Sequence, residues 1–116
     1  MGDYYCSADL GRFGEMGKNA SPLWESFNAW YGSVFAPGAL SRREKALIAL
    51  AVAHAVQCPY CIEAYTQEVL AQGGDLEQMT EAVHVAAAIR GGASLVHGVQ
   101  MRNAAEGLLP PEDQEA

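Results

Sequence analysis

The chain has 116 residues, of which 50% are hydrophobic, and its formal net charge at pH 7 is −7. This length corresponds to a single domain. The negative charge argues against nucleic acid or an anionic membrane surface as a partner. So high a hydrophobic fraction in a small chain predicts that some apolar surface is buried between subunits.

The cysteines form one close pair, Cys58 and Cys61, and one isolated residue, Cys6. An odd count without a visible export signal does not indicate a secreted disulfide framework. No apolar run approaches the roughly 20 residues needed to span a bilayer. We therefore expect a soluble, cytoplasmic protein in which Cys6 is a spare thiol, with a resolving role as the alternative.

The first 20 residues are Gly-rich and lack helical periodicity, so we expect them to form an arm. Ser21 and Pro22 favour the start of a first helix, with Ser as N-cap and Pro at the first helical position. Pro37 and Gly38 are expected to end this helix. Its apolar residues recur at helical spacing and are interpreted as core or subunit interface: Leu23, Phe27, Trp30, Tyr31 and Val34.

A second helix is indicated by Ser41 and Glu44, which have the spacing of a capping box. It is expected to run to about Gln57. Residues 46–56 are apolar nearly all round, so this helix should be buried on most of its sides.

Three more helices are expected in the rest of the chain. They run from Cys58 as N-cap, with Pro59 first, to Gly73-Gly74; from Asp75, with Gln78 three residues later, to Gly91-Gly92; and from Ala93 to Glu106. Since no stretch shows convincing β alternation, the predicted fold class is all-α. We divide the chain into an arm (1–20), a helical domain (21–107) and an acidic tail (108–116).

The Cys58-Pro59-Tyr60-Cys61 turn concentrates the chemistry of the sequence. The thiolate is the reactive form of cysteine, and a helix N-terminus favours an anion through its unpaired N–H groups and partial positive charge. The spacing brings the two thiols about one turn apart, close enough for a disulfide. This combination suits reversible dithiol chemistry, in which one thiolate attacks and the other thiol resolves.

Other interpretations of the pair are weaker. Structural zinc would require a second CxxC or a paired Cys/His run, which is missing, although His54 and His84 could in principle complete a site. Inert cysteines would make the helix-start placement a coincidence. The same four residues occur in glutaredoxins, but there they follow a strand, whereas here they follow an alanine-rich helix, so that fold is rejected.

His54 is the candidate base. In a helical hairpin that turns at residues 57–58, His54 lies about as far back as Cys61 lies forward, and it is four residues before Cys58. An imidazole beside a cysteine can generate a thiolate near neutral pH. The alternative is a core histidine that is hydrogen-bonded to a backbone carbonyl.

Glu44 and Tyr65 are lower-ranked catalytic candidates. Glu44 lies far from the turn, and capping already explains it. Tyr65 lies early in the third helix and either lines the pocket or faces the core.

The residues LSRREKALIALAVAHAVQCPYCIEAYTQEVLAQG carry a resemblance to a known family. An alanine-rich helix, a CxxC pair, a helix ending in Gly and a further capped helix resemble the carboxymuconolactone decarboxylase / alkylhydroperoxidase D superfamily over roughly residues 23–98. The segments DLGRFGEMGK, LWESF and AHAVQCPYC are similar to small peroxidase-like members associated with arsenosugar biosynthesis.

The resemblance implies a helical bundle organised around the central hairpin, which assembles as trimers or hexamers. It also implies an antioxidant peroxidase activity with no cofactor and no metal. One cysteine attacks the peroxide and then forms a redox-active disulfide with its partner, and an external dithiol or a thioredoxin-like protein reduces that disulfide.

The sequence departs from the peroxidase pattern at two positions. That pattern has a Glu twelve residues before the first cysteine and a His four residues after the second, where this chain has Ala46 and Tyr65. His54 is expected to replace this relay from the other side of the hairpin. The position beside His54 and the family pattern both favour Cys61 as the attacking thiol, whereas the helix start alone favours Cys58.

The predicted function is therefore that of a thiol-dependent, alkylhydroperoxidase-like oxidoreductase. Its catalytic residues are Cys58, Cys61 and His54. Alternative interpretations are a general disulfide oxidoreductase, an arsenical-binding dithiol protein, or a non-catalytic oligomeric scaffold.

Overall fold

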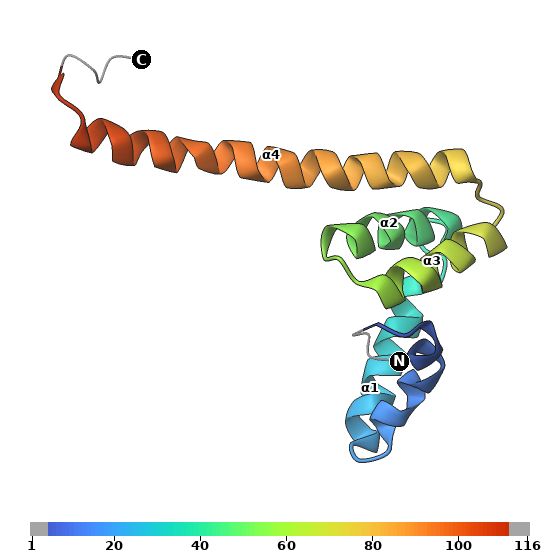
Figure 1. The fold of residues 1–116 in the computed structure, drawn as a ribbon. Coiled ribbons are helices and arrows are strands. Elements are labelled where there is room, and N and C mark those ends of the chain that lie inside the picture. Colours follow the sequence, from blue (N-terminus) through green and yellow to red (C-terminus); the bar gives the residue numbers. More distant parts are fainter. Residues whose placement is uncertain (1–4, 112–116) are drawn as a thin grey trace.

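The computed structural model describes residues 5–111. Its helices, in chain order, are η1 (Ser7–Gly17), which is a 3-10 helix, and the α-helices α1 (Ser21–Phe35), α2 (Arg42–Ala55), α3 (Pro59–Ala71) and α4 (Leu76–Leu108). The described residues contain no strand, which confirms the all-α prediction. Figure 1 shows the α2–α3 hairpin below the start of α4, with α1 and η1 on its other side.

The core lies where α2, α3 and the first turns of α4 meet. Its buried side chains are Ala46, Leu50, Val69 and Met79. Both predicted capping boxes are present: Ser41 and Glu44 at the start of α2, and Asp75 and Gln78 at the start of α4. Because these boxes satisfy backbone N–H groups at both helix starts, they fix where the chain enters each helix.

The turn between α2 and α3 is tight. α2 ends at Ala55, two residues earlier than predicted, since Gln57 adopts a positive φ of 56° that no α-helix can accommodate. The backbone N–H of Cys58 then donates to the carbonyl of Ala53 at 3.0 Å. Cys58 is the N-cap of α3 and Pro59 its first residue, as predicted.

The N-terminal segment differs from the predicted irregular arm. Residues 7–17 form η1, which packs on α1 through an edge-to-face contact of Phe13 and Trp24, with ring centroids 5.0 Å apart. The N-cap of α1 is Ala20, so Ser21 is the first helical residue and makes no side-chain cap. Residues 1–4 of the predicted arm lie outside the described residues.

α4 is one helix of 33 residues, so the predicted break at Gly91-Gly92 and the separate fifth helix are wrong. Neither glycine adopts a positive φ, and both continue the helix in spite of their low helix propensity. Only the first half of α4 packs on the hairpin, and its second half projects away from the molecule (Figure 1). Of the predicted acidic tail, residues 112–116 lie outside the described residues.

α2 is less buried in the protomer than predicted. Its face towards α3 and α4 is buried, but Ile48, Val52 and Val56 are 50%, 52% and 66% exposed on another face. The prediction assumed that apolar residues all round imply burial all round, whereas the described residues leave one apolar face half exposed beside α1. Among the described residues, no helix combines the length and apolar character that a membrane span requires.

Candidate dithiol site

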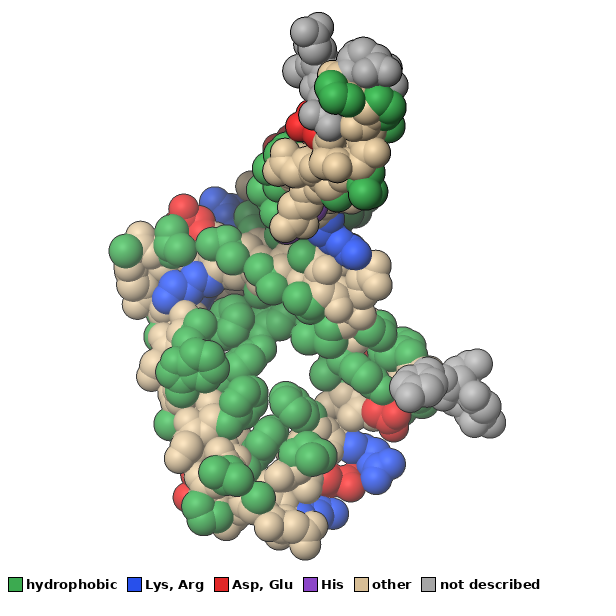
Figure 2. Space-filling view, turned by 90° about the vertical axis from the view of Figure 1, so that its left-hand side faces the viewer, with side chains coloured by type: hydrophobic (Ala, Val, Ile, Leu, Met, Phe, Trp, Pro, Cys, Tyr) green, Lys and Arg blue, Asp and Glu red, His purple; other side chains and the backbone are tan. Residues whose placement is uncertain are grey.

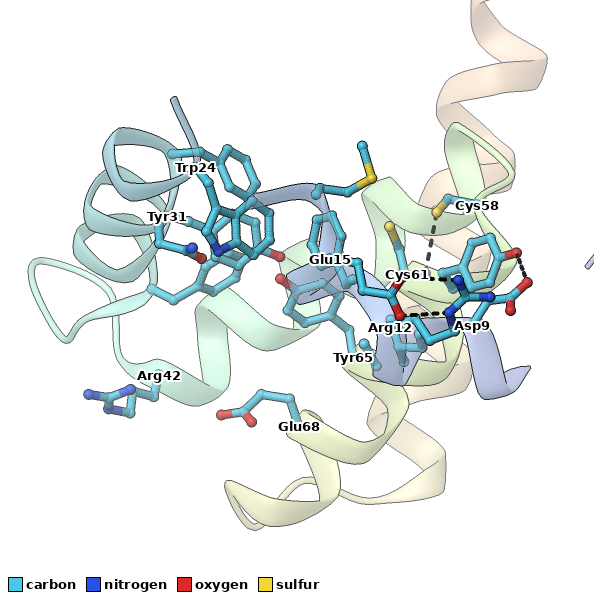
Figure 3. A pocket seen from close by; sticks show the side chains of 18 residues that line it. Asp9, Arg12, Glu15, Trp24, Tyr31, Arg42, Cys58, Cys61, Tyr65 and Glu68 are labelled. Carbon is cyan, nitrogen blue, oxygen red and sulfur yellow. Dashed lines mark hydrogen bonds and ion pairs between the residues drawn. The ribbon is translucent and has the colours of Figure 1, made fainter. Parts of the chain in front are cut away.

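Cys58 and Cys61 lie together at the first turn of α3, and both are free thiols. The backbone N–H of Cys61 donates to Sγ of Cys58 at 3.3 Å, so the sulfur takes the place of a capping oxygen. Figure 3 shows the two sulfurs pointing into the same space. An N–H donor and the helix N-terminus both favour negative charge at Sγ of Cys58.

Cys61 has the opposite environment. Burial, and then a hydrogen bond and charge interaction with Cys58, raise the pKa of the Cys61 thiol to about 11. A neutral Cys61 can donate its S–H to the neighbouring sulfur, which further favours a thiolate at Cys58. The two cysteines are therefore unequal: Cys58 caps the helix start with its sulfur, whereas Cys61 is the thiol whose pKa is raised.

Both thiols open onto a cavity of about 900 Å³ between η1, α1 and α3. Aromatic rings line one side of it, in a continuous series of contacts from Phe13 through α1 to Tyr65. Charged side chains stand at its margins, including Arg12, which pairs with Glu15 at 2.8 Å, and Glu68. The cavity thus has an apolar interior and an ionic rim beside the dithiol.

A second hollow of about 450 Å³ lies between α1 and α2 and meets the first one at the dithiol. Tyr31, Phe35, Cys61 and Tyr65 line both spaces. Cys61 therefore borders both hollows. The rings of Tyr31, Phe35 and Tyr65 separate one hollow from the other. Figure 2 shows the hydrophobic side chains gathered around a hollow in this region.

Tyr31 is the functional candidate that the sequence interpretation missed. It lines both hollows with Cys61, and burial, followed by the nearby charges of Cys61 and Cys58, raises the pKa of its hydroxyl. The hydroxyl therefore stays protonated and can donate a hydrogen bond. Its helical spacing had grouped Tyr31 with apolar core residues; the hydroxyl, which needs a polar partner when buried, was the available signal.

The other sequence candidates are placed differently. Tyr65 lies in the site, stacked on Phe35 with ring centroids 5.2 Å apart. His54 lines neither hollow, and its Nδ1 lies 2.8 Å from the carbonyl oxygen of Leu50, to which it can only donate. Glu44 also lines neither, and hydrogen bonds from Ser41 lower the pKa of its carboxyl. The structure brings Tyr65 to the thiols and does not bring His54 or Glu44 there.

The N-terminal segment contacts the CxxC turn at Tyr60, which lies between the two cysteines in the sequence. The rings of Tyr5 and Tyr60 are 4.8 Å apart, and the Tyr60 hydroxyl lies 3.5 Å from a carboxylate oxygen of Asp9. The Tyr5 hydroxyl donates to Glu63 at 2.8 Å, an interaction that raises the pKa of Tyr5 to about 12. Segments more than 50 residues apart in sequence are thus joined at the site.

No group of three or more Cys, His, Asp or Glu side chains within residues 5–111 is arranged to hold a metal ion. Of the histidines proposed to complete a zinc site, His84 is exposed on α4, and His54 is engaged with Leu50.

Residues 23–113, most of the chain, match the carboxymuconolactone decarboxylase family. The chain belongs to the carboxymuconolactone decarboxylase family. It is 44% identical over 84 residues to "Uncharacterized protein 4 in cox locus" of Paracoccus denitrificans, a match that covers 72% of this chain and 76% of that protein.

Two solved structures are similar in fold. A structural-genomics protein from Methanobacterium thermoautotrophicum has a TM-score of 0.70 and 32% identity, with 72% of this chain and 94% of that one covered. A carboxymuconolactone decarboxylase family protein from Legionella pneumophila has a TM-score of 0.68 and 29% identity, with 80% and 84% covered. Family membership and the helical fold are therefore established together.

Proposed function

We propose that this family member is a thiol-dependent oxidoreductase that reduces organic peroxides with the Cys58/Cys61 dithiol. The observation that carries this proposal is the unequal pair: Sγ of Cys58 accepts the N–H of Cys61, while the pKa of the Cys61 thiol is raised to about 11. A sulfur at a helix start beside a thiol whose pKa is raised suits a pair in which one thiol attacks and the other resolves.

The reaction has two steps. The Cys58 thiolate attacks the terminal oxygen of R–O–OH, forming an S–O bond as the O–O bond breaks; the alkoxide takes a proton from water and leaves as the alcohol. Sγ of Cys61 then attacks the resulting sulfenic acid, forming the S–S bond as the S–O bond breaks. The thiol proton of Cys61 leaves with the hydroxide as water.

This assignment favours Cys58 as the attacking residue, whereas the family pattern favours Cys61. Two physical arguments support Cys58: it caps the helix, and its sulfur accepts a hydrogen bond from the Cys61 backbone. A Cys61 thiol with a pKa near 11 is almost entirely protonated at pH 7. It suits the second step, in which its proton departs with water.

The aromatic cavity supplies the binding site in this proposal. Its volume, about 900 Å³, lies within the range of small-molecule sites, and its rings favour an organic rather than a small inorganic peroxide. The protonated Tyr31 hydroxyl is proposed to donate a hydrogen bond to the peroxide. Tyr31 and Tyr65 thereby take the place of the Glu–His relay that Ala46 and Tyr65 interrupt.

We further propose a cytoplasmic homo-oligomer, trimeric or hexameric, that is re-reduced by an external dithiol or a thioredoxin-like protein. The thiols are free and exposed to a cavity, which supports access by a reductant. The large exposed apolar side chains of the protomer support assembly.

The test is intact mass and thiol count on reduced protein before and after a stoichiometric pulse of tert-butyl hydroperoxide. The proposal predicts rapid loss of two thiols and two mass units, mapped to a Cys58–Cys61 bond. A Cys61→Ser variant should instead gain about one oxygen at Cys58. Thiols that survive the pulse would reject the peroxidase, and oxidation by a disulfide substrate alone would favour general disulfide exchange.

A further inference from the structure

The protomer exposes far more surface than a monomer of its mass. Its accessible area is 8640 Å², whereas a folded monomer of 12.4 kDa exposes roughly 6,100 Å². Its radius of gyration is 20.6 Å, against roughly 13 Å for a compact chain of this length. The excess of about 2,500 Å² is the size of an obligate subunit interface.

Two apolar surfaces are exposed on the protomer. The first is the distal α4 segment, residues 89–108, where Leu95, Val96 and Val99 are 81%, 64% and 54% exposed. The second is the α1–α2 groove, the 450 Å³ hollow whose floor includes Ile48, Val52 and Val56. Spacing of four residues places Ile48 and Val52 on one face of α2, and Val56 continues that row at the C-cap of the helix.

The distal α4 segment has the composition of a helix that another helix approaches closely. Residues 91–101 carry no Asp, Glu, Lys or Arg. Gly91, Gly92 and Gly98 lie inside the helix, at a cost of roughly 0.5–1 kcal/mol each relative to Ala. A Cβ at any of them would meet nothing within 4 Å, so packing within the protomer does not explain them.

We propose that the distal α4 segment of a second copy of this chain lies in the α1–α2 groove and closes the Cys61 side of the dithiol site. The segment cannot reach the groove of its own chain, because α4 continues unbroken away from α2 (Figure 1) and contributes no residue to the groove. Apolar groove and apolar helix occur once per chain, so each copy can give one helix and receive one. Such contacts can form reciprocally between two copies, or head to tail around a closed ring.

The consequence for the site is specific. Cys61, Tyr31 and Tyr65 line both the groove and the larger cavity. A partner helix in the groove would exclude water from one side of these residues and leave the aromatic cavity as the single entrance. The site of one chain would thus be completed by residues of the next. This inference rests on surface and packing and does not depend on the proposed reaction.

The experiment uses sedimentation equilibrium of the reduced full chain with two complementary variants. Val52→Asp damages the groove but keeps the helix, and Val96→Asp damages the helix but keeps the groove. Each should raise the apparent dissociation constant at least about 100-fold, because a carboxylate would be buried without a partner. Leu70→Asp, at a 54% exposed residue of α3 outside both surfaces, is the matched control and should assemble like wild type.

Mixing the two variants is the decisive step. One intact helix and one intact groove should restore a one-to-one complex of twice 12.4 kDa. In the separate variants, alkylation of Cys61 should be several-fold faster than in wild type. If an aspartate variant loses its helical circular dichroism, Val→Ser at the same position replaces it.

Three results would overturn the proposal. Wild-type protein that stays monomeric at about 100 µM has a dissociation constant above that value, which is too weak for an obligate interface. If Val96→Asp made the protein monomeric but Val52→Asp did not, the α4 helices of two copies would pair with each other. A mixture that stays monomeric would mean that the two surfaces do not meet.

Discussion

The backbone N–H of Cys61 donates to Sγ of Cys58 at 3.3 Å, and this contact makes the two cysteines chemically unequal. Cys58 caps α3 with its sulfur, as Ser or Asp does in other helices. Cys61 lies within the helix, where burial is the largest cause of its raised pKa. The predictions below follow from this asymmetry and from the residues around it.

Single serine substitutions should separate the two roles. In Cys61→Ser, the Cys58 thiol keeps the helix N-terminus and the N–H donor, so iodoacetamide should modify it rapidly at pH 7. In Cys58→Ser, the buried Cys61 thiol should react at least 10-fold more slowly than Cys58. Stopped-flow alkylation in a Cys6→Ser background measures both rates, and a faster Cys61 would reverse the assignment.

The pH dependence of Cys61 gives an independent check. A raised pKa means that the thiol is neutral at lower pH and that its reactive anion appears only as pH rises towards about 11. In Cys58→Ser two of the three causes are gone, but burial stays, so the midpoint should fall between about 9 and 11. Its alkylation rate should rise nearly tenfold from pH 7 to 8 and continue to rise to pH 9, and a plateau already below pH 8 would contradict the burial argument.

The parts of the fold that the sequence predicts are those decided by neighbouring residues. Ser41 with Glu44, Asp75 with Gln78, and Cys58 before Pro59 each fix a helix start through contacts within three positions, and all three are found. The placement of Cys58 and Cys61 in the first turn of α3 likewise depends only on neighbouring residues.

What could not be predicted depends on distant partners. Gly91 and Gly92 disfavour helix, yet no capping interaction stops α4 there, so the helix continues. The exposed face of α2 has the same apolar composition as its buried face, so composition alone does not separate the two. Tyr31 enters the site because α1 and α3 line one cavity, a relation that periodicity within α1 does not contain.

His54→Ala tests the base that the sequence suggested. Because Nδ1 of His54 is held by the Leu50 carbonyl and the ring lines neither hollow, we expect alkylation of Cys58 at pH 7 to stay within twofold of wild type. Stability should fall by about 1 kcal/mol through loss of one hydrogen bond. Alkylation slowed tenfold without unfolding would restore His54 as the activating base.

Glu44→Ala tests whether that carboxylate is structural. Hydrogen bonds from Ser41 lower its pKa, so the ionised form stabilises the fold above its unfolded pKa, and this stabilisation is lost as pH falls through the folded value. The melting temperature of the variant should be a few degrees below that of wild type at pH 7, and nearly equal to it at pH 3. Thiol kinetics should not change, and a loss of peroxide turnover at unchanged melting temperature would point to catalysis.

Tyr31→Phe removes one hydroxyl and keeps the ring that separates the two hollows. If the protonated hydroxyl donates to the peroxide, disulfide formation with tert-butyl hydroperoxide should slow by about 10-fold, while iodoacetamide alkylation of Cys58 stays unchanged because that reagent needs no such donor. Tyr5→Phe is the matched control, since it also removes a hydroxyl with a raised pKa, but one that bonds Glu63 outside the cavity. Equal peroxide rates in Tyr31→Phe and wild type would remove Tyr31 from the mechanism, whereas equal slowing in both variants would indicate a general effect on the packing around the CxxC turn.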